Sequence, residues 1–125
     1  MADDRRRYGL SGEKLAAEHL VANGYRILET NYKNRFGEID IVARDGRTLV
    51  FIEVKSRRST RFGTARGSIT PAKRRRVSMV ALGYLKSNGG IRQKARFDVV
   101  ALDACSPEGD VRIEIIKNAF DLNYG

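Results

Sequence analysis

Hydrophobic residues recur at helical spacing near the start of the chain. In residues 12–24, GEKLAAEHLVANG, Ala16 and Leu20 lie four positions apart and fall on one side of a helix. Gly24 supplies a stop signal at the end of this segment. Glu13 lies on the same side, in the first turn. The pattern predicts an amphipathic helix and leaves two roles for Glu13: an acid that favours the helix dipole, or one aimed at the interior.

Strand-like alternation follows this helix. Apolar and polar residues alternate in short segments bounded by turn residues, and Asp45-Gly46 signals a tight turn between two of them. The predicted strands are residues 25–33, 37–45, 48–56, 95–103 and 111–120.

A second helix is predicted between the third and fourth strands, in TPAKRRRVSMVALGYLKSNGG. Thr70 can cap its start, Pro71 suits its first position and Asn88-Gly89 ends it. The elements then follow the order αβββαββ. We therefore predict an α/β protein with a central mixed sheet flanked by helices. It should form a single domain over residues 1–125, with residues 1–10 as a flexible N-terminal arm.

The lengths of the apolar segments and the counts of Cys and His exclude several classes of protein. No segment approaches the roughly 18 to 20 apolar residues of a spanning helix, and the first residues, MADDRRRYGL, lack the apolar stretch of a secretory signal. We therefore expect a cytoplasmic protein without membrane association. The chain has one cysteine, Cys105, and one histidine, His19, which argues against an internal disulfide, a zinc site and a Cys–His catalytic pair.

The net charge of +9 is concentrated in one region. The 44 residues from Val54 to Phe97 hold 13 Lys and Arg and no acid, whereas the other 81 hold 11 basic residues and all 15 acids. Such a region attracts polyanions, chiefly nucleic acid, by releasing condensed counterions; the alternative is a generally basic surface. The predicted phosphate-binding residues are Arg57, Arg58, Arg61, Lys73, Arg74, Arg75 and Arg76. The last four crowd the first turns of the second helix, where the dipole disfavours cations, so they form either a solvated face or a phosphate site.

Charged residues interrupt the two strands around Asp45-Gly46. These residues are Glu38, Asp40, Glu53 and Lys55. Side chains alternate along a strand, so Ile39 and Ile41 should share the face opposite Asp40. If the turn centres on Asp45-Gly46, facing positions add up to about 91 or 92. Asp40 then lies one to two residues from the position of Glu53.

Two carboxylates about 4 Å apart repel by roughly 4 kcal/mol at an effective dielectric near 20, and a bound Mg²⁺ or Mn²⁺ offsets this. We expect Asp40 and Glu53 to hold the metal, with the Val54 carbonyl as a further ligand and Glu13 either as another ligand or as the group that orients a water. A metal here would polarise a phosphodiester and lower the pKa of a bound water. Lys55 would orient that water or stabilise charge in the transition state. Because a D-x₁₂-E-x-K spacing also occurs in strand-end salt bridges, a stabilising ion-pair cluster is the alternative.

Several segments resemble the bacterial YraN-type family of small proteins, over nearly the whole chain. They are GEKLAAEHLVANGYRILETN, RFGEIDIVARDGRTLVFIEVKSRR, FGTARGSITPAKRRRV, YL, RFDVVAL and NAF. The resemblance implies the restriction-endonuclease-like fold of the PD-(D/E)XK nucleases and similarity to archaeal Holliday junction resolvases. By position it implies an active site of Glu13, Asp40, Glu53 and Lys55. Ile39 stands where the superfamily motif often has proline, and Glu38 adds a carboxylate that is either a second ligand or part of a turn.

Taken together, these features predict a Mg²⁺- or Mn²⁺-dependent endonuclease that hydrolyses DNA, including branched or otherwise structured DNA. The main alternative is a nucleic-acid-binding protein that keeps the nuclease fold without cutting. An RNA-binding factor is a third, although aromatic stacking platforms are scarce in a chain without Trp. Resolvase-like relatives act as dimers, so the resemblance also implies a homodimer.

Overall fold

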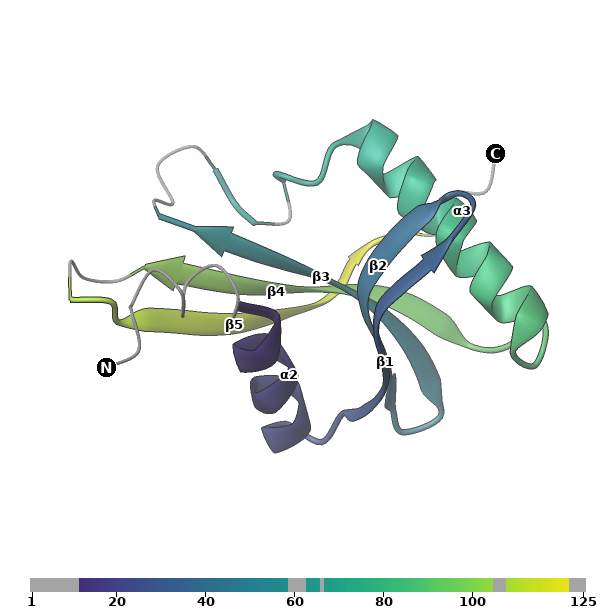
Figure 1. Cartoon of the computed structure of the whole chain (residues 1–125), viewed down its shortest axis with the longest axis horizontal. Coiled ribbons are helices and arrows are strands. Elements are labelled where there is room, and N and C mark those ends of the chain that lie inside the picture. Colours follow the sequence, from purple (N-terminus) through teal and green to yellow (C-terminus); the bar gives the residue numbers. More distant parts are fainter. Residues whose placement is uncertain (1–11, 59–62, 66, 105–107, 122–125) are drawn as a thin grey trace.

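The structure, a computed structural model, describes residues 12–58, 63–65, 67–104 and 108–121. The predicted N-terminal arm and Arg61 lie outside this part of the chain. Its elements are α2 (Gly12–Ala22), β1 (Arg26–Asn34), β2 (Gly37–Asp45), β3 (Thr48–Arg57), α3 (Pro71–Ser87), β4 (Ala95–Ala104) and β5 (Val111–Phe120), shown in Figure 1. No helix in the described part is long and apolar enough to cross a membrane.

The five strands form one sheet in the order β1-β2-β3-β4-β5. All neighbours are antiparallel except β3 and β4, which are parallel because α3 carries the chain back across the sheet between them. The predicted α/β class, the order αβββαββ and the mixed sheet flanked by helices are thereby confirmed. The arrangement is consistent with a nuclease-like fold.

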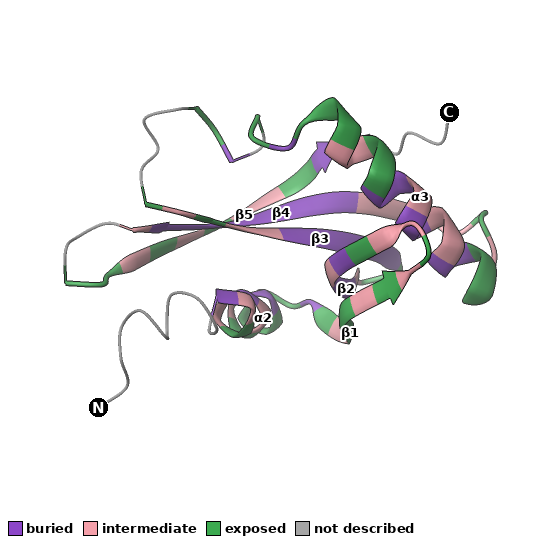
Figure 2. Cartoon of the chain, turned by 45° about the horizontal axis from the view of Figure 1, so that its top comes forward, coloured by how far each residue is buried: buried purple, intermediate pink, exposed green. Residues whose placement is uncertain are grey.

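A separate apolar core lies on each face of the sheet. The core on the α3 side contains Phe51 and Phe97 of the sheet and Val80 of α3. The core on the α2 side contains Ile52 and Leu20. Figure 2 shows that the two central strands, β3 and β4, carry most of the buried positions, as expected for strands covered on both faces. The sheet therefore gives the strand ends a rigid base.

The register between β2 and β3 differs from the prediction by one to two residues. Ile41 faces Ile52, so facing positions add up to 93, and the closing pair is Asp45 with Thr48. The turn is therefore Gly46-Arg47, with Gly46 at φ 62°, and not Asp45-Gly46. The paired register ends at Ile41 and Ile52, and Asp40 and Glu53 are the next residues of the two strands.

The expectation that Ile39 and Ile41 share a face is wrong. Ile39 packs in the core on the α3 side and Ile41 in the core on the α2 side. Between them the ladder is irregular: the Val54 N–H donates to Asp40 Oδ2 at 2.8 Å, and Asn31 of β1, on the other side of β2, has φ 53°. This local twist interrupts the two-residue alternation at Asp40.

Candidate functional site

Two acids meet where β2 and β3 separate. The regular ladder ends at Ile41 and Ile52, and Asp40 and Glu53 follow directly. Beyond that pair the Asp40 carboxylate replaces a main-chain carbonyl as the acceptor for Val54. Glu53 is buried, with only 7% of the residue exposed. The two acids therefore follow the last pair of the ladder directly, and they lie close enough for the charge of Asp40 to act on Glu53.

Burial and mutual repulsion disfavour the charged form of both acids. Burial raises the pKa of Glu53 to about 7, the charge of Asp40 adds to this, and Lys73 opposes it. Burial also raises the pKa of Asp40; the Val54 N–H lowers it and the charge of Glu13 raises it. A cation between the two carboxylates would reverse both shifts.

One oxygen of Glu53 has no partner. Its Oε2 lies 3.6 Å from the Lys73 ammonium. Its Oε1, in contrast, is the one buried side-chain nitrogen or oxygen of the described residues that lacks a hydrogen-bond partner. An unsatisfied buried polar atom costs about 1–3 kcal/mol, and more when charged. This oxygen fits a metal ligand, since oxygen donors are what Mg²⁺ and Mn²⁺ take.

Lys73 reaches this acid because of the way α3 begins. Thr70 caps the helix by accepting the Lys73 N–H at 3.2 Å through Oγ1, and Pro71 occupies the first turn, as predicted. The crossover from β3 brings this first turn within ion-pair distance of Glu53. Sequence reasoning grouped Lys73 with the phosphate-binding residues and missed its ion pair with Glu53. No local sequence signal could have revealed it, because the contact spans 20 positions.

The other predicted active-site residues surround this pair without joining it. Lys55 follows Glu53 by two residues on β3, is half-buried and pairs across the parallel ladder with Ala101. Glu13 is half-buried in the first turn of α2 and acts on Asp40 through its charge. Among the described residues, no three His, Cys, Asp or Glu side chains gather closely enough to hold a metal by themselves. The roles of Lys55, Glu13 and the Val54 carbonyl stay predictions.

The predicted phosphate-binding residues differ in how their donors are used. Arg57 donates to both oxygens of Asp103, at 2.8 and 3.0 Å, and to the Gly63 carbonyl at 2.8 Å, so it ties the following loop to β4. Arg74 donates to the Ile69 carbonyl and lies over the ring of Phe120. Of the predicted phosphate-binding residues that the structure describes, Arg58, Arg75 and Arg76 are exposed.

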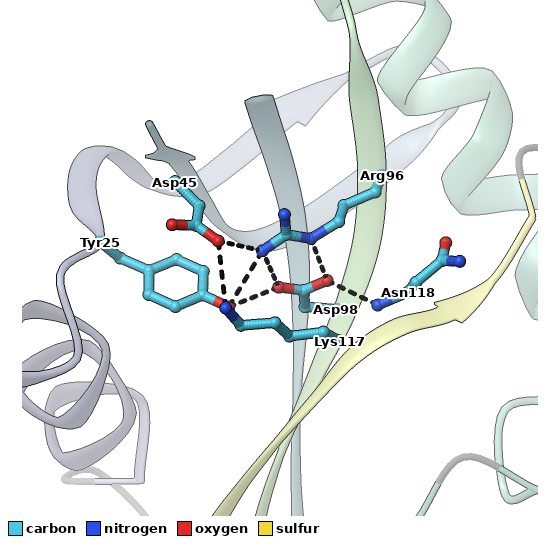
Figure 3. A network of polar contacts seen from close by, with 6 residues as sticks. All are labelled: Tyr25, Asp45, Arg96, Asp98, Lys117 and Asn118. Carbon is cyan, nitrogen blue, oxygen red and sulfur yellow. Dashed lines mark hydrogen bonds and ion pairs between the residues drawn. The ribbon is translucent and has the colours of Figure 1, made fainter. Parts of the chain in front are cut away.

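A second polar cluster, which sequence reasoning missed, lies at the other end of the sheet (Figure 3). It comprises Tyr25, Asp45, Arg96, Asp98, Lys117 and Asn118. Asp98 is 0% exposed and accepts from the Tyr25 hydroxyl at 2.7 Å, from Arg96 at 2.9 and 3.1 Å, and from the Asn118 N–H at 2.9 Å. Burial raises the pKa of Tyr25, and its bond to Asp98 raises it further. Hydrogen bonds or ion pairs link all six residues, so the cluster joins β2, β4, β5 and the residue before β1 without needing a ligand.

Fold and site together define an α/β protein of nuclease-like arrangement, with a buried Glu53 and a half-buried Asp40 where the β2–β3 ladder ends, beside a basic helix. The chain belongs to the Uncharacterised protein family UPF0102, whose sequence model matches residues 12–102. This confirms the resemblance to the YraN-type family.

Relatives match over most of their length. A UPF0102 protein of Syntrophus aciditrophicus is 54% identical over 119 residues, 95% of this chain and 92% of the relative. A UPF0102 protein of Geobacter sulfurreducens is 49% identical over 116 residues, which are 93% of this chain and 90% of the relative. Among solved structures, the Pyrococcus furiosus protein SfsA in complex with Ca²⁺ is similar with a TM-score of 0.45 and 11% identity, over 90% of this chain and 63% of that chain.

Proposed function

We propose that this protein is a Mg²⁺- or Mn²⁺-dependent endonuclease that hydrolyses DNA, branched or structured DNA included. The observation that carries the proposal is the unpartnered, buried Oε1 of Glu53 next to Asp40 at the end of the ladder. A protein gains no stability from an orphaned acid, so a ligand that binds there explains its retention.

Each residue has a distinct part in this proposal. Asp40 and Glu53 hold the metal, and the Val54 carbonyl is the further protein ligand. When bound there, a divalent metal would supply Lewis-acid polarisation of the phosphoryl group and would lower the pKa of a bound water. Lys55 orients that water and stabilises charge that develops on the phosphate. Glu13, on the α2 side, either binds the metal as well or orients the water.

The basic residues position the DNA. Arg58, Arg75 and Arg76 are exposed and contact phosphates, which fixes the strand without reading bases. Arg57 and Arg74 support this surface from behind through their bonds to Asp103 and Ile69. Lys73 belongs both to the phosphate-binding residues and to the acid site, because its ammonium pairs with Glu53.

That ion pair also favours the second candidate function, a DNA-binding protein that does not cut. In this case Lys73 would neutralise Glu53 permanently and no metal would be needed. The two candidates differ in what a divalent metal does.

Cleavage of end-labelled linear duplex and four-way junction DNA, with Mg²⁺, Mn²⁺ or EDTA, separates them. The endonuclease should cut only with metal, and Asp40→Asn and Glu53→Gln should each lower the rate at least about 100-fold while DNA binding persists. The matched control is Glu18→Gln, which removes an exposed acid of α2 and should leave the rate unchanged. Binding without cutting under every condition would support the second candidate.

A further inference from the structure

One face of α3 runs from Glu53 of β3 to the β1–β2 turn. Residues 73, 76, 80 and 83 recur at spacings of three and four and so lie in one row on the helix. Lys73 meets Glu53 of β3. Arg76 and Val80 follow beside the start of β2, where a Cβ built on Gly37 would lie 3.4 Å from both side chains. The row therefore leads from the acid pair towards the turn between β1 and β2.

Hydrogen bonds and close packing hold the β1–β2 turn against this row of α3 residues. The Asn34 amide nitrogen donates to the Val80 carbonyl at 3.1 Å, and its oxygen accepts the Phe36 N–H at 3.0 Å. The turn comes so close to α3 that a Cβ on Gly83 would lie 2.7 Å from the Asn34 amide nitrogen. Phe36 packs against the core on the α3 side. In Figure 1 the tip of the β1–β2 hairpin lies against the middle of α3.

The β1–β2 turn carries an exposed cation, Arg35, whose position depends on the contact between this turn and α3. Arg35 is exposed, and its guanidinium lies 4.7 Å from the centroid of the Phe36 ring. Arg76, beside Gly37, is also exposed. Lys33 is a weaker contributor, because its ammonium lies 3.8 Å from Glu38, the nearby acid of the same hairpin. Figure 2 shows exposed positions on the first turns of α3 and on the hairpin tip.

We propose that Arg35 extends the DNA-binding surface, so that the strand engaged at the acid pair continues along α3, past Arg76, to the β1–β2 turn. Arg35 lies outside the acid-free basic region, so charge along the sequence does not reveal it; only the docking of the turn on α3 brings it to this surface. The inference rests on the proposed function, because it assumes that the substrate is DNA. Stacking on Phe36 leaves the edge of the guanidinium available for a phosphate.

Binding of a fluorescein-labelled 20-base-pair duplex, measured by anisotropy in EDTA from 50 to 300 mM NaCl, tests this assignment. Arg35→Gln should weaken binding about tenfold at low salt and lower the slope of log affinity against log salt by about one. Arg35→Lys should restore most of the slope. The matched control is Arg47→Gln, which removes the same charge from the exposed turn at the other end of β2 and should change the affinity less than about twofold.

The outcomes separate the inference from the proposed function. If the wild type binds the duplex but Arg35→Gln changes affinity and salt slope no more than Arg47→Gln does, Arg35 does not extend the DNA-binding surface. The nuclease proposal would be unaffected by that result. If the wild type does not bind DNA at all, both fail. Melting temperatures should be equal for the wild type and all three variants, since both positions are exposed.

Discussion

Two buried acids of the same sheet have opposite surroundings. Asp98 accepts hydrogen bonds from Tyr25, Arg96 and the Asn118 main chain. Glu53 has one ion pair at 3.6 Å and one buried oxygen without a partner. A satisfied acid stabilises the fold, whereas an unsatisfied one costs stability and needs a functional reason. Hydrogen bonding, more than residue type, therefore distinguishes the structural cluster around Asp98 from the candidate site at Glu53.

Replacement of Glu53 by Gln should stabilise the metal-free protein at pH 8. Burial and the charge of Asp40 raise the pKa of Glu53 from 4.5 to about 7 in the folded protein. Between these values the folded state holds a proton that the unfolded state has released, so stability falls as pH rises and levels off above about 7. At about 1.4 kcal/mol per pKa unit, the free energy of unfolding of Glu53→Gln should exceed that of the wild type by up to about 3.5 kcal/mol at pH 8.

Urea unfolding in EDTA at pH 4.5, 6 and 8 measures this gain, which should shrink towards zero at pH 4.5. Glu18→Gln controls for loss of an exposed acid. Stability curves of wild type and Glu53→Gln that run parallel over the whole pH range would contradict the burial of a charged Glu53.

Asp98→Asn is the matched change at the structural cluster and should have the opposite sign. It leaves Arg96 facing an uncharged amide at a position that is 0% exposed. Loss of one partner from a buried ion pair costs about 3–5 kcal/mol, so the free energy of unfolding should fall by roughly 3 kcal/mol at pH 8. Urea unfolding beside Glu53→Gln measures it; a neutral or stabilising effect would mean that Asp98 does not anchor the sheet.

At the scale of elements, hydrophobic periodicity and capping residues predicted the helices and strands well. Thr70 and Pro71 start α3 where the sequence indicated. The register of β2 on β3 could not be derived in the same way, because an Asp-Gly pair does not determine which two residues form the turn. The exchange of faces between Ile39 and Ile41 was also unpredictable, since it depends on Asp40 bonding to Val54 across the sheet.

The docking of the β1–β2 turn on α3 is a packing contact that a double-mutant cycle can measure. A helix-interior Gly→Ala change usually stabilises by about 1 kcal/mol, but a Cβ on Gly83 would lie 2.7 Å from the Asn34 amide nitrogen. Gly83→Ala should therefore be neutral or destabilising alone, and should stabilise by about 1 kcal/mol in an Asn34→Ala background. Thermal unfolding of the four proteins tests this. Additive effects would show that the turn does not press on α3.

At the scale of the whole molecule, the two ends of the sheet differ in how their buried acids are hydrogen-bonded. The cluster of Asp98 and Arg96 holds the β2–β3 turn end. At the opposite end β2 and β3 separate, and the crossover into α3 sets Lys73 against Glu53. The sequence alone predicted the acids and the basic region. It could not predict which cation would meet which acid, because that depends on the path of the β3–α3 connection.

The central claim is that Asp40 and Glu53 form a site for a divalent metal, and calorimetric titration with Mn²⁺ tests it most directly. At pH 8 Glu53 is mostly deprotonated, as a metal ligand must be. We predict one site in the wild type, unchanged in Glu18→Gln, and weakened at least about tenfold, or 1.4 kcal/mol, in both Asp40→Asn and Glu53→Gln. No binding heat in the wild type, or equal affinity in all four proteins, would contradict the account.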